Sequence, residues 1–204
     1  MARTLGTVKA YYDRRAPEYD DWYEGIGLYA DRDRPDWDVE LEQLVNTIES
    51  LPPLRTLDVA CGTGFLTRHL AGELTCLDQS EAMLRITGDR VPRARLVESD
   101  AFPLPFADGA FERVFTGHFY GHLEDADRLA FLAEARRVAR ELVIVDSSIA
   151  HSPVAEERQP RLLKDGSEWQ VYKRFFSGEG LVEELGGGEV LHEGRWFVVV
   201  RAPA

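Results

Sequence analysis

Two aspartates and a glycine-containing turn are spaced as a nucleoside site requires. Asp58 lies in an apolar stretch that runs into a turn, in the letters LDVACGTG at 57–64. Gly62 and Gly64 allow backbone N–H groups to approach a ligand closely, and Asp58 can accept a hydrogen bond from a ligand ammonium group. Asp78 ends the next apolar stretch, where a carboxylate can bind both ribose hydroxyls of an adenosine. The pattern predicts one nucleoside-binding crevice; alternatively, Asp58 stabilises the turn and Asp78 caps a helix.

The glycine spacing argues against a dinucleotide site, which shares the order of strand, glycine turn, helix and acid. Reading Gly-x-Gly-x-x-Gly from Gly62 places Thr67 at the third glycine, and reading from Ala60 places Phe65 there. The observed order is Asp-x-Ala-x-Gly-x-Gly. A nicotinamide-dependent oxidoreductase therefore remains only as an alternative, further disfavoured because the chain has no room for a separate substrate domain.

Short apolar runs that alternate with helical patterns must position these residues. A helix is expected over 37–51, after Pro35 and before Pro52-Pro53, and it should lead into the first strand. After it, the spacing of the apolar residues predicts strands near 56–60, 74–77, 95–97, 113–116 and 142–145, with helices near 64–70, 81–87 and 125–140. Two further strands, 189–192 and 195–201, are joined by a tight Glu193-Gly194 turn. The result is an α/β fold with a mostly parallel sheet and a C-terminal antiparallel hairpin.

Composition limits the partners. The 204 residues include 24 Lys and Arg against 36 Asp and Glu, a net charge of −12, which argues against binding along a nucleic-acid backbone or an anionic membrane. Small molecules or proteins remain, and the oligomeric state is left open. Cys61 and Cys76 make neither a disulfide framework nor a zinc cluster, so no metal is expected. No signal-peptide pattern follows Met1, and we expect a cytoplasmic protein folded as a single domain over residues 1–204.

Motifs along residues 8–150 resemble those of the class I S-adenosylmethionine-dependent methyltransferases. The 57–64 turn is similar to the family's motif I, although Ala60 stands where the first glycine is usual. The letters SDA at 99–101 resemble the adenine-contacting segment, and FPLPFADGAFE at 102–112 is similar to the type 11 methyltransferase domain. The letters YYDRRAPEYD at 11–20 resemble the amino-terminal helix that folds over the cofactor. This resemblance implies a Rossmann-like, mixed seven-stranded sheet with helices on both faces.

The resemblance also implies a cofactor, S-adenosyl-L-methionine, and a set of residues around it. Residues 1–50 would form a helical cap, and the methyl group would pass to a small-molecule acceptor by in-line displacement in a dry pocket. A protein that binds the cofactor or its product without catalysis is the alternative outside enzymology. The residues implied in cofactor binding are Tyr11, Tyr19, Asp58, Ala60, Cys61, Gly62, Gly64, Asp78, Gln79, Asp100, Ala101 and His118.

The acceptor side carries the less specific predictions. His118, past the fourth strand, is the candidate base or pocket-lining residue, and His122 is the weaker one because a histidine at this junction can simply cap backbone groups. Residues 151–177 are the segment least like the shared core. There the resemblance suggests that Trp169, Tyr172 and Arg174 line the acceptor site; packing of these side chains onto the sheet is the alternative.

Overall fold

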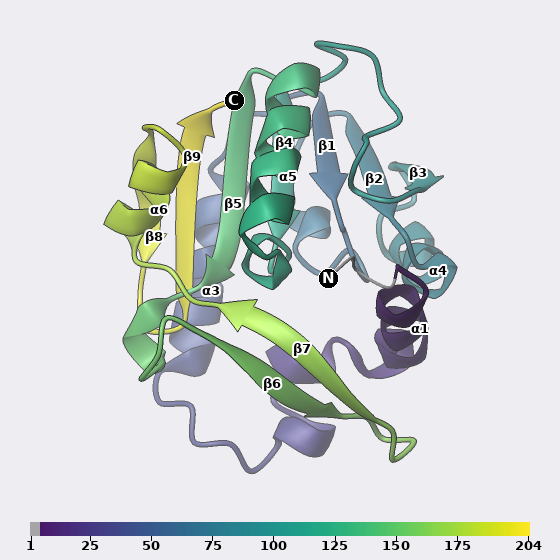
Figure 1. Cartoon of the computed structure of the whole chain (residues 1–204), viewed down its shortest axis with the longest axis vertical. Helices are drawn as coiled ribbons and strands as arrows, with labels where there is room; N and C mark the ends of the chain where they lie inside the picture. Colours follow the sequence, from purple (N-terminus) through teal and green to yellow (C-terminus); the bar gives the residue numbers. More distant parts are fainter. Residues whose placement is uncertain (1–4) are drawn as a thin grey trace.

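In the computed structural model the strands form one seven-stranded sheet and one separate two-stranded ribbon (Figure 1). The structure describes the backbone of residues 5–204 and the side chains of residues 8–204. In spatial order the sheet contains β3 (Arg95–Glu98), β2 (Leu74–Asp78), β1 (Thr56–Val59), β4 (Arg113–Gly117), β5 (Glu141–Ser147), β9 (Phe197–Pro203) and β8 (Glu189–Glu193). The first five are mutually parallel, and β9 is antiparallel to both β5 and β8. The predicted mixed sheet with a C-terminal antiparallel hairpin is confirmed.

Helices cover both faces of this sheet. The α-helices of the described residues are α1 (Leu5–Arg15), α2 (Asp21–Glu24), α3 (Trp37–Glu49), α4 (Glu81–Arg90), α5 (Asp125–Val138) and α6 (Gly178–Glu184). Phe131 of α5 and Leu181 of α6 pack on one face, whereas Leu44 and Ile48 of α3 pack on the other. The central strands are buried on both sides, which explains their near-continuous apolar runs such as LVIV at 142–145.

The glycine turn does not open a long helix. After β1 the chain makes only a short 3₁₀ turn over Thr67–His69, where a helix over 64–70 was expected. Gly64 has a φ of +70°, which is incompatible with a right-handed helix. The Thr67 hydroxyl donates to Asp58 at 2.5 Å, which holds the turn against the end of β1.

The amino-terminal segment is likewise broken where one helix was expected over 11–20. The helix α1 ends at Arg15, and a 3₁₀ turn over Ala16–Glu18 follows. Pro17 lacks the N–H that a continuing helix needs. Tyr11 therefore lies in α1, whereas Tyr19 lies in the turn that follows the 3₁₀ segment.

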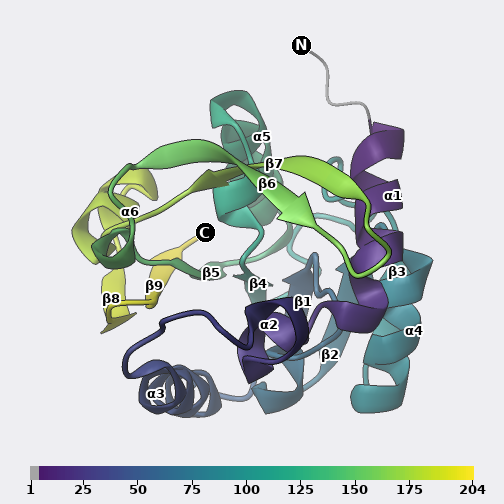
Figure 2. The same ribbon diagram turned by 90° about the horizontal axis from the view of Figure 1, so that it is seen from below.

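The ribbon of β6 (Glu156–Leu162) and β7 (Glu168–Arg174) was not predicted from the sequence. It crosses below the carboxyl edge of the sheet in Figure 1. Figure 2, the view from below, shows the ribbon on one side of that edge and the amino-terminal helices α2 and α3 on the other. The amino-terminal helices and the ribbon therefore flank the carboxyl ends of the parallel strands, the edge where open α/β sheets bind ligands.

Candidate functional site

A first cavity opens where β1, β2 and β4 end. With its open mouth it measures about 660 Å³. Its lining includes Tyr12 and Val8 of α1 as well as residues after the strands. The predicted cofactor residues that line it are Tyr19, Ala60, Gly62, Asp78, Gln79, Asp100, Ala101 and His118. The fold thus brings together, at one sheet edge, segments that are more than a hundred residues apart in the sequence.

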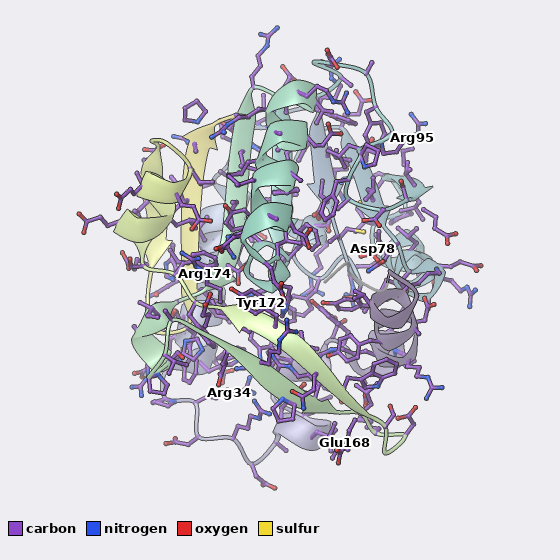
Figure 3. All side chains as sticks on the ribbon, in the orientation of Figure 1. Arg34, Asp78, Arg95, Glu168, Tyr172 and Arg174 are labelled. Carbon is purple, nitrogen blue, oxygen red and sulfur yellow. The ribbon has the colours of Figure 1, made fainter. Side chains whose placement is uncertain are left out.

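Asp78 joins the glycine turn to the start of α4. Its Oδ2 accepts the Gly62 N–H at 2.9 Å and its Oδ1 accepts the Ser80 N–H at 2.9 Å. Ser80 itself caps α4 by accepting the Met83 N–H at 3.2 Å. Burial raises the pKa of Asp78 to about 6, although these backbone hydrogen bonds oppose the rise. Asp78 thus lines the cavity with its carboxyl group held in a fixed orientation at the end of β2, where Figure 3 labels it.

Asp58 lies deeper, beside a smaller adjoining cavity. It is buried, and Oδ1 has no hydrogen-bond partner among the described residues. Burial raises the pKa of Asp58 to about 7, and the charge of Asp78 raises it further in spite of the Thr67 hydrogen bond. Cys61, Ala60 and Tyr19 line this smaller cavity too. An orphaned carboxylate oxygen next to the main cavity suits a ligand cation.

Two residues with a side chain adopt left-handed backbone at this edge. Ala60 has a φ of +58° and His118 a φ of +55°. Gly62, at +57°, lies under the ring of Tyr19, where an added Cβ would be 3.7 Å from Cε1 of the tyrosine. Gly64 lines none of these cavities and instead packs closely against Thr87. Such strained residues gather where the surroundings hold a ligand-binding surface in place.

His118 marks the boundary between the first cavity and a second one. It is buried, and its ring meets those of Trp22 at 4.9 Å and Phe197 at 5.8 Å between centroids. Nδ1 faces Asp146 Oδ1 at 3.9 Å, and Nε2 has no partner among the described residues. Burial lowers the pKa of His118 to about 3, with Asp146 acting in the opposite direction, so the imidazole is neutral at pH 7.

The second cavity continues from the first past Tyr12, Tyr19, His118 and His122, which line both. It measures about 1340 Å³ with its mouth. Its walls come from α1, from the segment around Trp22–Trp37, from residues after β5, and from one face of the β6–β7 ribbon. Of the predicted cofactor residues, Tyr11 lines this cavity and not the first.

The three residues predicted for acceptor binding lie outside the walls of both cavities. Tyr172 donates from its hydroxyl to Glu156 at 2.5 Å, and Arg174 pairs with Glu184 at 3.2 Å on α6. Figure 3 marks both on the part of β7 that passes beneath α5. Trp169 packs against Tyr11 at 5.6 Å between ring centroids. The cavity is lined instead by Val171 and Lys173, on the opposite face of β7 from Tyr172 and Arg174.

His122 has a clear local role. Its Nδ1 lies 2.7 Å from the carbonyl oxygen of Tyr172, so the ring donates to that oxygen and ties the turn after β4 to the ribbon. Burial lowers the pKa of His122 well below its usual value. A contact of His122 with backbone groups was one of the two roles that its position in the sequence suggested. His122 makes this contact and also lines both cavities.

Sequence reasoning missed most of the second cavity. Arg15, Trp22, Arg161 and Lys173 all line it, and none was singled out as a site residue. One signal in the sequence could have found Arg161 and Lys173. In the strands EERQPRL and EWQVYKR, every second residue lies on the same face, so each strand presents one set of side chains to the cavity.

Among the described residues no cluster of three or more His, Cys, Asp or Glu could hold a metal ion. Within the same part of the chain, no helix has the length and apolar character of a membrane span.

Comparisons with known proteins agree with this geometry. A family model described as "Methyltransferase domain" matches residues 56–141. Demethylmenaquinone methyltransferase of Thermotoga maritima is 34% identical over 104 residues, which cover 48% of this chain and 44% of the relative. Malonyl-[acyl-carrier protein] O-methyltransferase of Geobacter sulfurreducens is 42% identical over 98 residues, 44% of this chain and 36% of the relative. The chain therefore spans less than half the length of these two curated relatives.

A solved structure matches over the whole chain. The structure described as "DhpI-SAH complex structure" is 26% identical, with a TM-score of 0.72, and the match covers 100% of this chain and 99% of that one. The likeness therefore includes the β6–β7 ribbon and the amino-terminal helices, which lie outside the family-model match.

Proposed function

Because the chain contains a class I S-adenosylmethionine-dependent methyltransferase domain, we propose that it transfers a methyl group from S-adenosylmethionine to a small-molecule acceptor. The observation that carries the proposal is the pair of adjoining cavities that meet at His118. One is bordered by the glycine turn and Asp78, and the other lies between the amino-terminal helices and the ribbon. A transfer reaction between two bound molecules needs such a junction.

The residues of the first cavity fit the methyl donor. Asp78 would hold the ribose hydroxyls, and the segment with Gln79, Asp100 and Ala101 would border the adenine. Asp58 offers an orphaned carboxylate oxygen to the ammonium group, and Tyr19 covers Gly62 from the side of the cap. When bound, S-adenosylmethionine supplies a methyl group on a positively charged sulfur. The protein's own task is to align the acceptor with it and to exclude water.

His118 is proposed to orient the acceptor. Its Nδ1 faces Asp146, so Nε2 is left as the acceptor of a hydrogen bond at the junction of the cavities. Because burial lowers the pKa of His118 to about 3, the ring is a weak base. It would therefore fix a donor group of the acceptor by hydrogen bonding instead of taking up its proton fully.

The domain organisation, the location and the class of acceptor complete the proposal. We propose one domain over residues 1–204, with residues 1–50 as a cap over the cofactor and 151–177 as an insertion on the acceptor side. We also propose a cytoplasmic location. The acidic net charge of −12 supports an acceptor other than nucleic acid or membrane lipid. The alternative, a protein that binds the cofactor without turnover, would keep the first cavity and lose methyl transfer.

Thermal unfolding tests the cofactor assignment. S-adenosylhomocysteine at about one hundred times its dissociation constant should stabilise the fold by roughly 2.7 kcal/mol and raise the midpoint by about 5–10 °C. Asp78→Ala should remove this shift, whereas Asp89→Ala, an exposed acid on α4, should retain it. A shift with NAD and none with S-adenosylhomocysteine would refute the proposal. Formation of S-adenosylhomocysteine from S-adenosylmethionine in the presence of an acceptor separates an enzyme from a binding protein.

A further inference from the structure

The walls of the second cavity reverse the charge balance of the chain. Over the whole sequence acids outnumber bases by 36 to 24. In the cavity the cationic side chains are Arg15, Arg32, Arg34, Arg161 and Lys173, and the acidic ones are only Asp33 and Glu157. Both of these acids are exposed, as is Arg32, whereas Arg15 and Lys173 are buried. A cluster of cations inside a recess concentrates positive potential where a ligand would lie.

Arg15 is the most deeply placed of these cations. Only 9% of the residue surface is exposed. The guanidinium donates to the hydroxyl groups of Tyr11 and Tyr29, and Nε has no partner among the described residues. Among the described residues no carboxylate pairs with it. A buried guanidinium without a counter-charge is costly, so an anionic ligand would stabilise the site by supplying one.

Arg161 approaches the same space from β6. Residues 157, 159 and 161 of this strand line the cavity, and Arg158 lies on the other face, where it pairs with Glu124. Within the described part of the chain Arg161 makes no hydrogen bond or ion pair. Burial lowers the pKa of Arg161, and the nearby charge of Arg15 lowers it further. Two uncompensated guanidinium groups therefore share one recess.

Lys173 is not part of this uncompensated pair. Its ammonium group bonds to Asp146, which also accepts the Gly121 N–H at 2.7 Å. Arg34 is held at the carbonyl oxygen of Trp22 at 2.6 Å and stacks on Trp37 at 4.1 Å. Rings such as Phe175 and Trp196 complete the wall. The recess thus combines aromatic surface with free cationic groups.

We infer that the methyl acceptor is a small organic oxyanion, a carboxylate or a phosphonate- or phosphate-type group, whose charge is bound by Arg15 and Arg161 and whose apolar part lies against the aromatic wall. Guanidinium groups bind the oxygens of such anions with charge-assisted, bidentate hydrogen bonds. This inference rests on the proposed function, because it assigns the second cavity to the acceptor.

Three probes of similar size test the inference on protein saturated with S-adenosylhomocysteine. Benzoate and phenylphosphonate carry the two kinds of oxyanion, and benzamide is the neutral counterpart. At equal ionic strength, one or both anions should bind and raise the unfolding midpoint further, while benzamide should not. Binding by benzoate alone identifies a carboxylate site, and binding by phenylphosphonate alone identifies a phosphonate- or phosphate-type site.

Two arginine variants on the same strand provide the matched comparison. Arg161→Gln should weaken anion binding by about tenfold or more, since it removes a charge-assisted hydrogen bond, and should keep the S-adenosylhomocysteine shift. Arg158→Gln, on the opposite face, should change neither. The inference is overturned if the Arg161→Gln variant still binds the anions as tightly as the wild-type protein. It is also overturned if benzamide binds as tightly as the anions do. A normal S-adenosylhomocysteine shift with no anion binding also overturns it, whereas loss of that shift in the wild-type protein overturns the proposed function itself.

Discussion

Replacing Ala60 with glycine should stabilise the protein, although it removes a methyl group from a half-buried position. Ala60 has a φ of +58°, in the left-handed region that costs a residue with a Cβ about 1–2 kcal/mol. Glycine removes that strain but adds about 0.4–1 kcal/mol of unfolded-state entropy to be lost on folding. The expected net gain in the free energy of unfolding is about 0.5–1 kcal/mol, or a rise in the midpoint of about 1–4 °C.

A second alanine provides the control. Ala30 has a φ of −60° and is exposed, so glycine there relieves no strain. Ala30→Gly should therefore lower the free energy of unfolding by about 0.4–1 kcal/mol. The same chemical change should thus have opposite signs at the two positions, and urea unfolding with an unchanged slope measures both. If Ala60→Gly destabilised the protein as much as Ala30→Gly, the argument from backbone strain in the turn would be refuted.

Two further predictions concern buried carboxylates. Glu40 on α3 accepts hydrogen bonds from the backbone N–H groups of Arg195, Trp196 and Phe197 at 2.9, 2.7 and 2.8 Å. Glu40→Ala should therefore lower the free energy of unfolding by about 3 kcal/mol or more. As the control, Glu42→Ala at an exposed position should change it by no more than about 0.5 kcal/mol. Equal, small effects in chemical denaturation would contradict this. Burial raises the pKa of Asp58 to about 7, so its contribution to stability is present below its unfolded pKa of about 3.8 and is lost as pH rises through about 7. Asp58→Asn should therefore gain stability relative to wild type between pH 4 and pH 8, by of the order of 2–4 kcal/mol; a difference that does not change with pH would disprove the raised pKa.

The sheet could be predicted because its signals are local. The strand over 142–145 is a run of four apolar residues, and the structure extends it only to Glu141–Ser147. The helix α5 begins with Asp125 and Asp127 and ends with Arg136 and Arg137, as the helix dipole favours. Two helices that the sequence predicted are shorter in the structure, each because of one residue. Gly64, with its positive φ, prevents a helix directly after β1, and Pro17 ends the amino-terminal helix early.

The ribbon was missed because its sequence does not look like a strand pair. Pro160 lies within β6, and most positions of that strand are exposed, three of them occupied by charged residues. A two-stranded ribbon tolerates this, because Pro160 pairs with Gln170 at an edge and no further strand needs its missing N–H. Alternation could show that Tyr172 and Arg174 share a face, but only the packing of β7 against the cap and α6 decides which face meets the cavity.

The donor side of the site and its acceptor side differ in how they are encoded. Asp58, Gly62 and Asp78 belong to two adjacent strands and one turn, so their spacing in sequence determines their spacing in space. Arg15 and Arg161 come from segments nearly 150 residues apart, and neither lies in a motif. The net charge does not reveal this cationic cavity either, because it sums over all residues and most of the charged ones are acidic. A charge of −12 argues against binding of a long polyanion along the exterior, yet it is compatible with a small anion inside a recess lined by arginine.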